Sequence, residues 1–102
     1  MAVIHINKDN FEQIKNGDQT VLIDFYADWC GPCRMVAPIV EELSKDNPDV
    51  VIGKVNVDDD PELAQAYGVM SIPTLIVLKG GKEVARSTGA RPKAQLQAML
   101  DK

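Results

Sequence analysis

The pattern of apolar and polar residues along the chain predicts both strands and helices. A short β-prone run occupies 3–6, and the almost continuous apolar runs at 21–27 and 50–57 are typical of central strands covered on both faces. Two later runs, at 75–78 and 83–87, flank a pair of glycines, which predicts an antiparallel hairpin. We therefore expect five strands.

Between these strands, apolar residues recur at helical spacing. The predicted helices run from 7 to about 15, from the second cysteine to the turn at 46–48, from 61 to 66, and onward from 91–92. Asn7 is the expected cap of the first helix, and Pro38 is expected to bend the second. Because parallel crossovers are right-handed, the helices fall on both faces of the sheet. The fold class is α/β, with a mixed five-stranded sheet flanked by four helices.

Composition excludes several classes of function. The 102 residues include 11 Lys and Arg against 15 Asp and Glu, a net charge of −4, which leaves no basic surface for nucleic acid. No apolar stretch approaches the roughly 20 residues of a membrane helix. The first residues do not resemble a secretory signal, so we expect a cytoplasmic protein. Its length predicts a single domain over 1–102. We also expect the protein to act as a monomer.

Candidate chemistry lies at the two cysteines, Cys30 and Cys33. Residues three apart on a helical turn share a face, ~5–6 Å apart at Cβ, so a disulfide can form or open with little backbone motion. Cys30 is expected where strand gives way to helix, and the helix dipole there favours a thiolate, which makes Cys30 the attacking sulfur. Cys33, one turn inward and less exposed, would resolve the mixed disulfide.

The two residues between the cysteines suit this role. Pro32 fits the first helical turn, where its missing N–H is not needed, and Gly31 permits close approach of a partner backbone. The alternative is half of a zinc site, but His5 is the only other soft ligand, so zinc would need a dimer. A cluster bridged between two chains has the same difficulty. We expect neither a metal nor a cofactor.

Asp24 is a second candidate, because a carboxylate inside an apolar strand is costly to bury. Its pKa should be raised, which suits proton exchange near neutral pH. It precedes Cys30 by six positions, a distance that a bridging water would span. The alternative is a structural carboxylate paired with Lys54 from the neighbouring strand, and the two readings are compatible.

Taken together, these residues resemble the thioredoxin family over essentially the whole chain. The matching positions are Trp29-Cys30-Gly31-Pro32-Cys33, Pro38, Lys54, Ile72-Pro73-Thr74, Gly81 and Gly89. The resemblance implies a thioredoxin fold and reduction of protein disulfides by dithiol exchange, with Cys30 as nucleophile and Cys33 as resolving thiol. It also implies that Gly31 and Pro32 set a reducing potential and that Asp24 deprotonates Cys33. The implied partners are disulfide-containing proteins and a thioredoxin reductase.

The resemblance further implies a substrate-binding patch. Ile72-Pro73 would be a cis bond facing the cysteines, so that the Ile72 backbone can pair with a substrate strand. Trp29 would shield the thiolate and contact partners, although a plain core role explains a tryptophan equally well. Gly81 and Gly89 would supply flat surface in the same patch, although a hairpin and a cap also account for them.

The sequence departs from the family at Tyr26, where many members carry a second tryptophan, and at Met70-Ser71, where basic or glycine-containing pairs are common. Two alternatives to a reductase stay open. One is an oxidant or isomerase, which the Gly31-Pro32 pair and the missing signal disfavour. The other is a binding subunit that uses the fold as a surface, with incidental cysteines.

Overall fold

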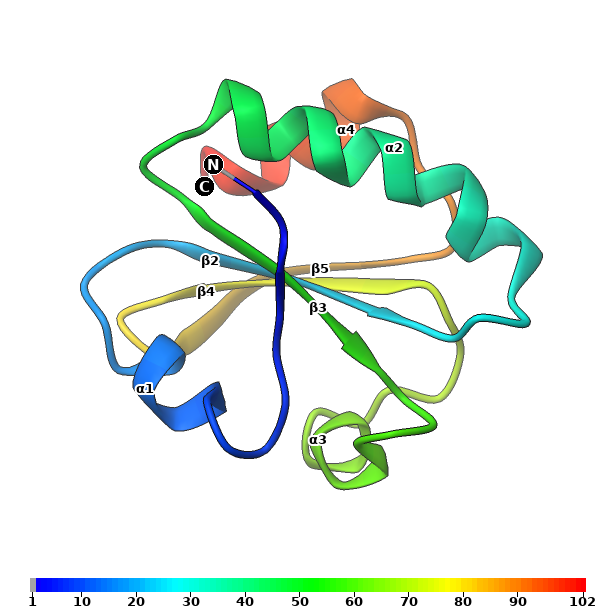
Figure 1. The fold of residues 1–102 in the computed structure, drawn as a ribbon. Coiled ribbons are helices and arrows are strands. Elements are labelled where there is room, and N and C mark those ends of the chain that lie inside the picture. The colour runs from blue at the N-terminus through cyan, green and yellow to red at the C-terminus, as the bar shows by residue number, and fades with distance from the viewer. Residues whose placement is uncertain (1) are drawn as a thin grey trace.

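The computed structural model describes residues 2–102, in which five strands form one mixed sheet ordered β1-β3-β2-β4-β5 (Figure 1). The strands are β1 (Ile4–His5), β2 (Val21–Tyr26), β3 (Val51–Asn56), β4 (Thr74–Lys79) and β5 (Lys82–Thr88). β1, β3 and β2 run parallel, whereas β4 is antiparallel to β2 and β5 is antiparallel to β4. The predicted mixed sheet is confirmed, with β2 at its centre.

Four helices cover the sheet, as predicted: α1 (Phe11–Lys15), α2 (Gly31–Asp46), α3 (Pro61–Ala66) and α4 (Lys93–Leu100). Figure 1 shows α2 and α4 on one face of the sheet and α1 and α3 on the other. The helix α2 continues through Pro38 without a break.

The predicted start of the first helix at Asn7 was wrong. The helix α1 begins at Phe11, with Asn10 as its N-cap. The Asn7 side chain instead accepts hydrogen bonds from the backbone N–H groups of Asp9 and Asn10, at 2.9 and 3.1 Å. Because these bonds hold a turn, the chain enters the helix three residues later than the sequence pattern suggests.

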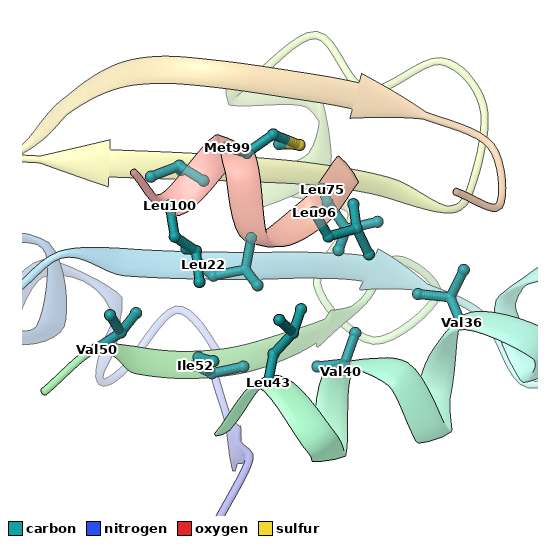
Figure 2. Packing of buried hydrophobic residues seen from close by; sticks show 11 residues of the cluster. Leu22, Val36, Val40, Leu43, Val50, Ile52, Leu75, Leu96, Met99 and Leu100 are labelled. Carbon is teal, nitrogen blue, oxygen red and sulfur yellow. The ribbon is translucent and has the colours of Figure 1, made fainter. Parts of the chain in front are cut away.

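The side chains of β2 divide the core into two layers. Leu22 belongs to the cluster beneath α2 and α4 (Figure 2), whereas Val21, Ile23 and Phe25 belong to the cluster beneath α1 and α3. Successive side chains of a strand point to opposite faces, so Asp24 faces α2 together with Leu22. A carboxyl group is thereby placed at the edge of an apolar layer, close to the start of α2.

Candidate functional site

The first site residue, Cys30, lies at the junction of β2 and α2. It is the N-cap of α2, in an extended conformation with φ −90° and ψ 112°, and a proline follows in the first turn. The backbone N–H of Cys33 donates a hydrogen bond to the Cys30 sulfur over 3.2 Å. A sulfur at this position faces free N–H groups and the positive end of the helix dipole, both of which favour a thiolate.

A disulfide joins Cys30 to Cys33, with their Cα atoms 5.3 Å apart, a usual span for such a bond. The exposed fractions of Cys30 and Cys33 are 5% and 4%, so both residues are buried and Cys33 is the less exposed by a small margin. Both are covered by the same neighbours, among them Ala27, Tyr26 and Ile72. The two residues therefore differ mainly in their position on the helix, because Cys30 is the N-cap of α2 and Cys33 lies inside its first turn.

The Ile72-Pro73 peptide bond faces Cys30. It is cis, as the resemblance implied, and the Ile72 carbonyl oxygen lies 3.8 Å from the Cys30 sulfur. The Gly89 N–H donates to the Pro73 carbonyl over 2.8 Å, and the Thr74 hydroxyl donates to the Ser71 carbonyl over 2.6 Å. These two bonds fix the conformation of the loop that carries Ile72 and tie it to the end of β5.

Asp24 lies behind the cysteines and is 3% exposed. Burial raises the pKa of its carboxyl group to about 7, and the nearby Lys54 charge partly opposes that rise. Its Oδ1 atom is buried without a hydrogen-bond partner in the described chain. A cavity of about 180 Å³ borders both Asp24 and Cys33, which is room enough for water between them.

Lys54 occupies the position next to Asp24 on β3, since the two residues are register partners in the parallel pair. The predicted pairing is not an ion pair, because no Asp24–Lys54 contact within 4 Å occurs among residues 2–102. The Lys54 ammonium instead lies 5.2 Å from the centre of the Tyr26 ring. Its charge reaches Asp24 across the cavity that both residues border.

Trp29 is on the surface, so the alternative of a core tryptophan was wrong. The residue is 68% exposed, and its indole N–H donates to an oxygen of the Asp58 carboxylate over 2.9 Å. Together with Ile72 and the 96% exposed Met70, it borders a surface hollow of about 390 Å³.

Comparisons with known proteins agree with this geometry. The sequence model of the family described as Thioredoxin matches residues 2–102. A thioredoxin from Alicyclobacillus acidocaldarius subsp. acidocaldarius is 49% identical over 97% of this chain and 95% of the relative. The chain belongs to the thioredoxin family. A Chlamydia pneumoniae thioredoxin is 48% identical over 95% of this chain and 94% of its own length.

A solved structure supports the fold of this thioredoxin family member. A mutant thioredoxin from Halobacterium salinarum NRC-1 superposes with a TM-score of 0.92 at 34% identity, covering 98% of this chain and 88% of that one. The chain is a thiol-disulfide oxidoreductase that performs dithiol–disulfide exchange through its Cys-x-x-Cys site. Its activity belongs to electron transport and redox homeostasis.

The two glycines of the predicted substrate patch lie far apart in this thioredoxin fold. Gly89 is bonded to Pro73 beside the cysteines. Gly81 follows the end of β4, next to Lys15, at the opposite end of the sheet from Cys30. The placement of Gly81 in the patch was wrong, because β4 runs away from the site along its whole length.

Sequence reasoning missed Asp58, whose carboxylate accepts the hydrogen bond from the Trp29 indole. The signal was present, because β2 and β3 are parallel and their carboxyl ends meet at one edge of the sheet. Trp29 follows β2 and Asp58 follows β3, so their meeting could have been predicted. The hydrogen bond of the Thr74 hydroxyl, by contrast, could not have been predicted from the sequence, since its partner depends on the path of the loop before β4.

In residues 2–102, no three His, Cys, Asp or Glu side chains of the chain gather in a position to hold a metal ion. Within the same residues, none of the helices has the length and apolar character needed to cross a membrane.

Proposed function

We propose that this chain acts as a protein-disulfide reductase, with Cys30 as the nucleophile and Cys33 as the resolving thiol. The observation that carries the proposal is the position of the Cys30 sulfur, which caps α2 and accepts the Cys33 N–H over 3.2 Å. In the reduced protein these same groups would stabilise a Cys30 thiolate. Cys33, one turn inside the helix, has no comparable position.

The exchange proceeds in two balanced steps. The Cys30 thiolate attacks one sulfur of the substrate disulfide, and a Cys30–substrate bond forms as the substrate bond breaks and releases a thiolate. Cys33 loses its proton and then attacks Cys30, which releases the second substrate sulfur and forms the Cys30–Cys33 disulfide. Two electrons pass to the substrate, and the two released thiolates become thiols by taking up the proton that left Cys33 and one proton from solvent.

Asp24 is proposed as the base that takes the Cys33 proton. Its carboxyl group borders the same cavity as Cys33, and its pKa of about 7 lets it both accept and return a proton near neutral pH. A water in that cavity would carry the proton between them. Lys54 supports this role by favouring the charged form of Asp24.

The surrounding residues are proposed to tune the potential and to bind substrate. Gly31 and Pro32 form the exposed turn between the cysteines and set a reducing potential. The residues proposed to contact the substrate chain are Trp29, Ile72, Pro73 and Gly89. The Ile72 and Gly89 backbones lie at the Cys30 end of the sheet, where an extended substrate segment can pair with them.

Disulfide-containing proteins are the proposed substrates, and a thioredoxin reductase is the proposed source of electrons. We place the protein in the cytoplasm, acting as a monomer, because a reducing compartment keeps a dithiol carrier reduced. An oxidase would require a much more strongly stabilised Cys30 thiolate.

Trapping experiments test these roles. We expect Cys33→Ser to accumulate a mixed disulfide with a substrate protein, because the second attack is lost, whereas Cys30→Ser accumulates none. The products are followed on non-reducing gels and by mass spectrometry. If the Cys30→Ser variant trapped the substrate instead, the roles of the two cysteines would be reversed.

Equilibration of the wild-type cysteine pair with glutathione tests whether the protein reduces or oxidises its substrates. A reducing potential near those of thioredoxins, ~−270 mV, would support a reductase, whereas an oxidising potential would support an oxidase.

A further inference from the structure

Tyr26 borders the same cavity as Asp24. The two residues are two positions apart on β2, so their side chains lie on the same face of the sheet. Lys54 joins them from β3 as the register partner of Asp24. All three side chains border the cavity that also reaches Cys33.

The Lys54 ammonium lies over an aromatic ring although a carboxyl group is the neighbouring residue in the sheet. Its nitrogen is 5.2 Å from the centre of the Tyr26 ring, within the range at which a cation is attracted to the ring face. Across residues 2–102, no nitrogen–oxygen contact within 4 Å joins Lys54 to Asp24. The ring therefore competes with the carboxylate for this cation.

The other groups that face Asp24 do not replace Lys54. Cys33 and Arg34 border the cavity from α2, and Asp28 borders it from the loop between β2 and α2. The Arg34 guanidinium donates to the Asp28 carbonyl over 2.8 Å, which holds that cation at the outer rim. His5 is the register partner of Lys54 on β1 and is therefore one strand further from Asp24. The position of Lys54 is thus the adjustable part of the field at Asp24.

We propose that Tyr26 is a positioning residue for the exchange reaction, because its ring holds the Lys54 ammonium away from the Asp24 carboxyl group. Asp24 then keeps its proton until neutral pH and can exchange it with Cys33, a consequence that rests on the function proposed above. Without the ring, the ammonium would move against the carboxylate and stabilise its charged form.

The experiment measures the titration of the Asp24 carboxyl group by carbon-13 NMR in the reduced protein. We expect Tyr26→Leu and Tyr26→Met to lower the titration midpoint by about one pH unit, since the cation approaches the carboxylate. Tyr26→Phe keeps the ring and is the matched control, with a midpoint within ~0.3 of the wild type. Either non-aromatic variant suffices if the other does not fold.

A second background separates cation placement from burial. In Lys54→Met, the change Tyr26→Leu should leave the Asp24 midpoint where Lys54→Met alone puts it. If Tyr26→Leu lowered the Asp24 midpoint equally with and without Lys54, entry of water would explain the shift and the proposal would be overturned. An unchanged Asp24 midpoint in both Tyr26→Leu and Tyr26→Met would also overturn it.

The pH profile of substrate reduction tests the underlying function separately. If Asp24→Asn leaves that profile unchanged, the proposed base role of Asp24 fails, whereas the NMR titration still decides the placement of Lys54 by Tyr26. If Asp24→Asn removes a step from the profile, Tyr26→Leu should move that same step toward lower pH, and a step that stays in place would contradict the proposal.

Discussion

At the scale of single residues, Asp24 links the site to the stability of the fold. Burial raises the pKa of its carboxyl group from 3.8 to about 7. Because the pKa is higher in the folded state, the folded protein holds a proton that the unfolded chain releases between these pH values. The favourable contribution is complete below pH 3.8 and is lost as pH rises through about 7, a total loss of ~4 kcal/mol.

Replacing this carboxyl group should therefore flatten the pH dependence of stability. Between pH 5 and 8, we expect the wild type to lose about 3 kcal/mol more free energy of unfolding than Asp24→Asn, measured by urea denaturation. The exposed Asp18 on the loop before β2 provides the control, since Asp18→Asn should follow the wild type. Parallel curves for Asp24→Asn and the wild type would show that Asp24 does not lose its proton in this range.

The residues that sequence alone could place are those whose positions depend on local chemistry. Cys30 was expected at a helix start because an apolar strand ends just before it and a proline follows, and it is the N-cap of α2. The buried Asp24 was predicted on the same grounds. The contact of Lys54 with Tyr26 could not be predicted, because it depends on which of two neighbours the flexible lysine approaches.

At the scale of elements, the β4–β5 hairpin and the loop after β5 allow a matched test of substrate binding. Gly81 and Gly89 have φ values of 78° and 89°, which favour glycine. An alanine at either position should cost about 1 kcal/mol, measured by thermal unfolding. Only Gly89→Ala should also slow reduction of a protein disulfide, because Gly89 bonds to Pro73 whereas Gly81 lies beside Lys15. Slower reduction by Gly81→Ala alone would contradict the proposed patch.

The end of α2 is joined to α4 by a pair of side-chain amides. Asn47 and Gln97 exchange two hydrogen bonds of 2.8 and 3.0 Å in a partly buried position. We expect Gln97→Ala to cost ~1–2 kcal/mol, because both bonds are lost and the Asn47 amide stays partly covered. The partly exposed Lys93, which contacts Asp46 at 2.6 Å, is the comparison, and Lys93→Ala should change the urea midpoint less. A larger loss of stability in Lys93→Ala than in Gln97→Ala would mean that the ion pair, and not the amide pair, holds the two helices together.

The existence of these elements could be predicted, but not their order in the sheet. Apolar runs and helical spacing indicated five strands and four helices, and right-handed crossovers indicated helices on both faces. The order β1-β3-β2-β4-β5 and its register depend on which strand edges meet in the folded chain. The error at Gly81 followed from this, since a hairpin turn cannot be assigned to an end of the sheet until the direction of β4 is known.

At the scale of the whole molecule, β2 connects the two apolar layers. Leu22 and Ile23 are adjacent, both have an exposed fraction of 0%, and they belong to clusters on opposite faces of the sheet. The radius of gyration of 12.1 Å is close to the ~13 Å expected of a single domain of this length. We infer that residues 2–102 fold as one unit, because neither layer has a strand set of its own.

Two neighbouring substitutions test this unity. Leu22→Ala and Ile23→Ala should each lower the free energy of unfolding by ~2–5 kcal/mol, since each leaves a cavity in one layer. Because β2 is shared, each variant should still unfold in urea in a single transition with the wild-type slope. Tryptophan fluorescence reports the site at Trp29 and circular dichroism reports the whole chain. Two separate midpoints in either variant would show that the layers fold independently and would contradict a single domain.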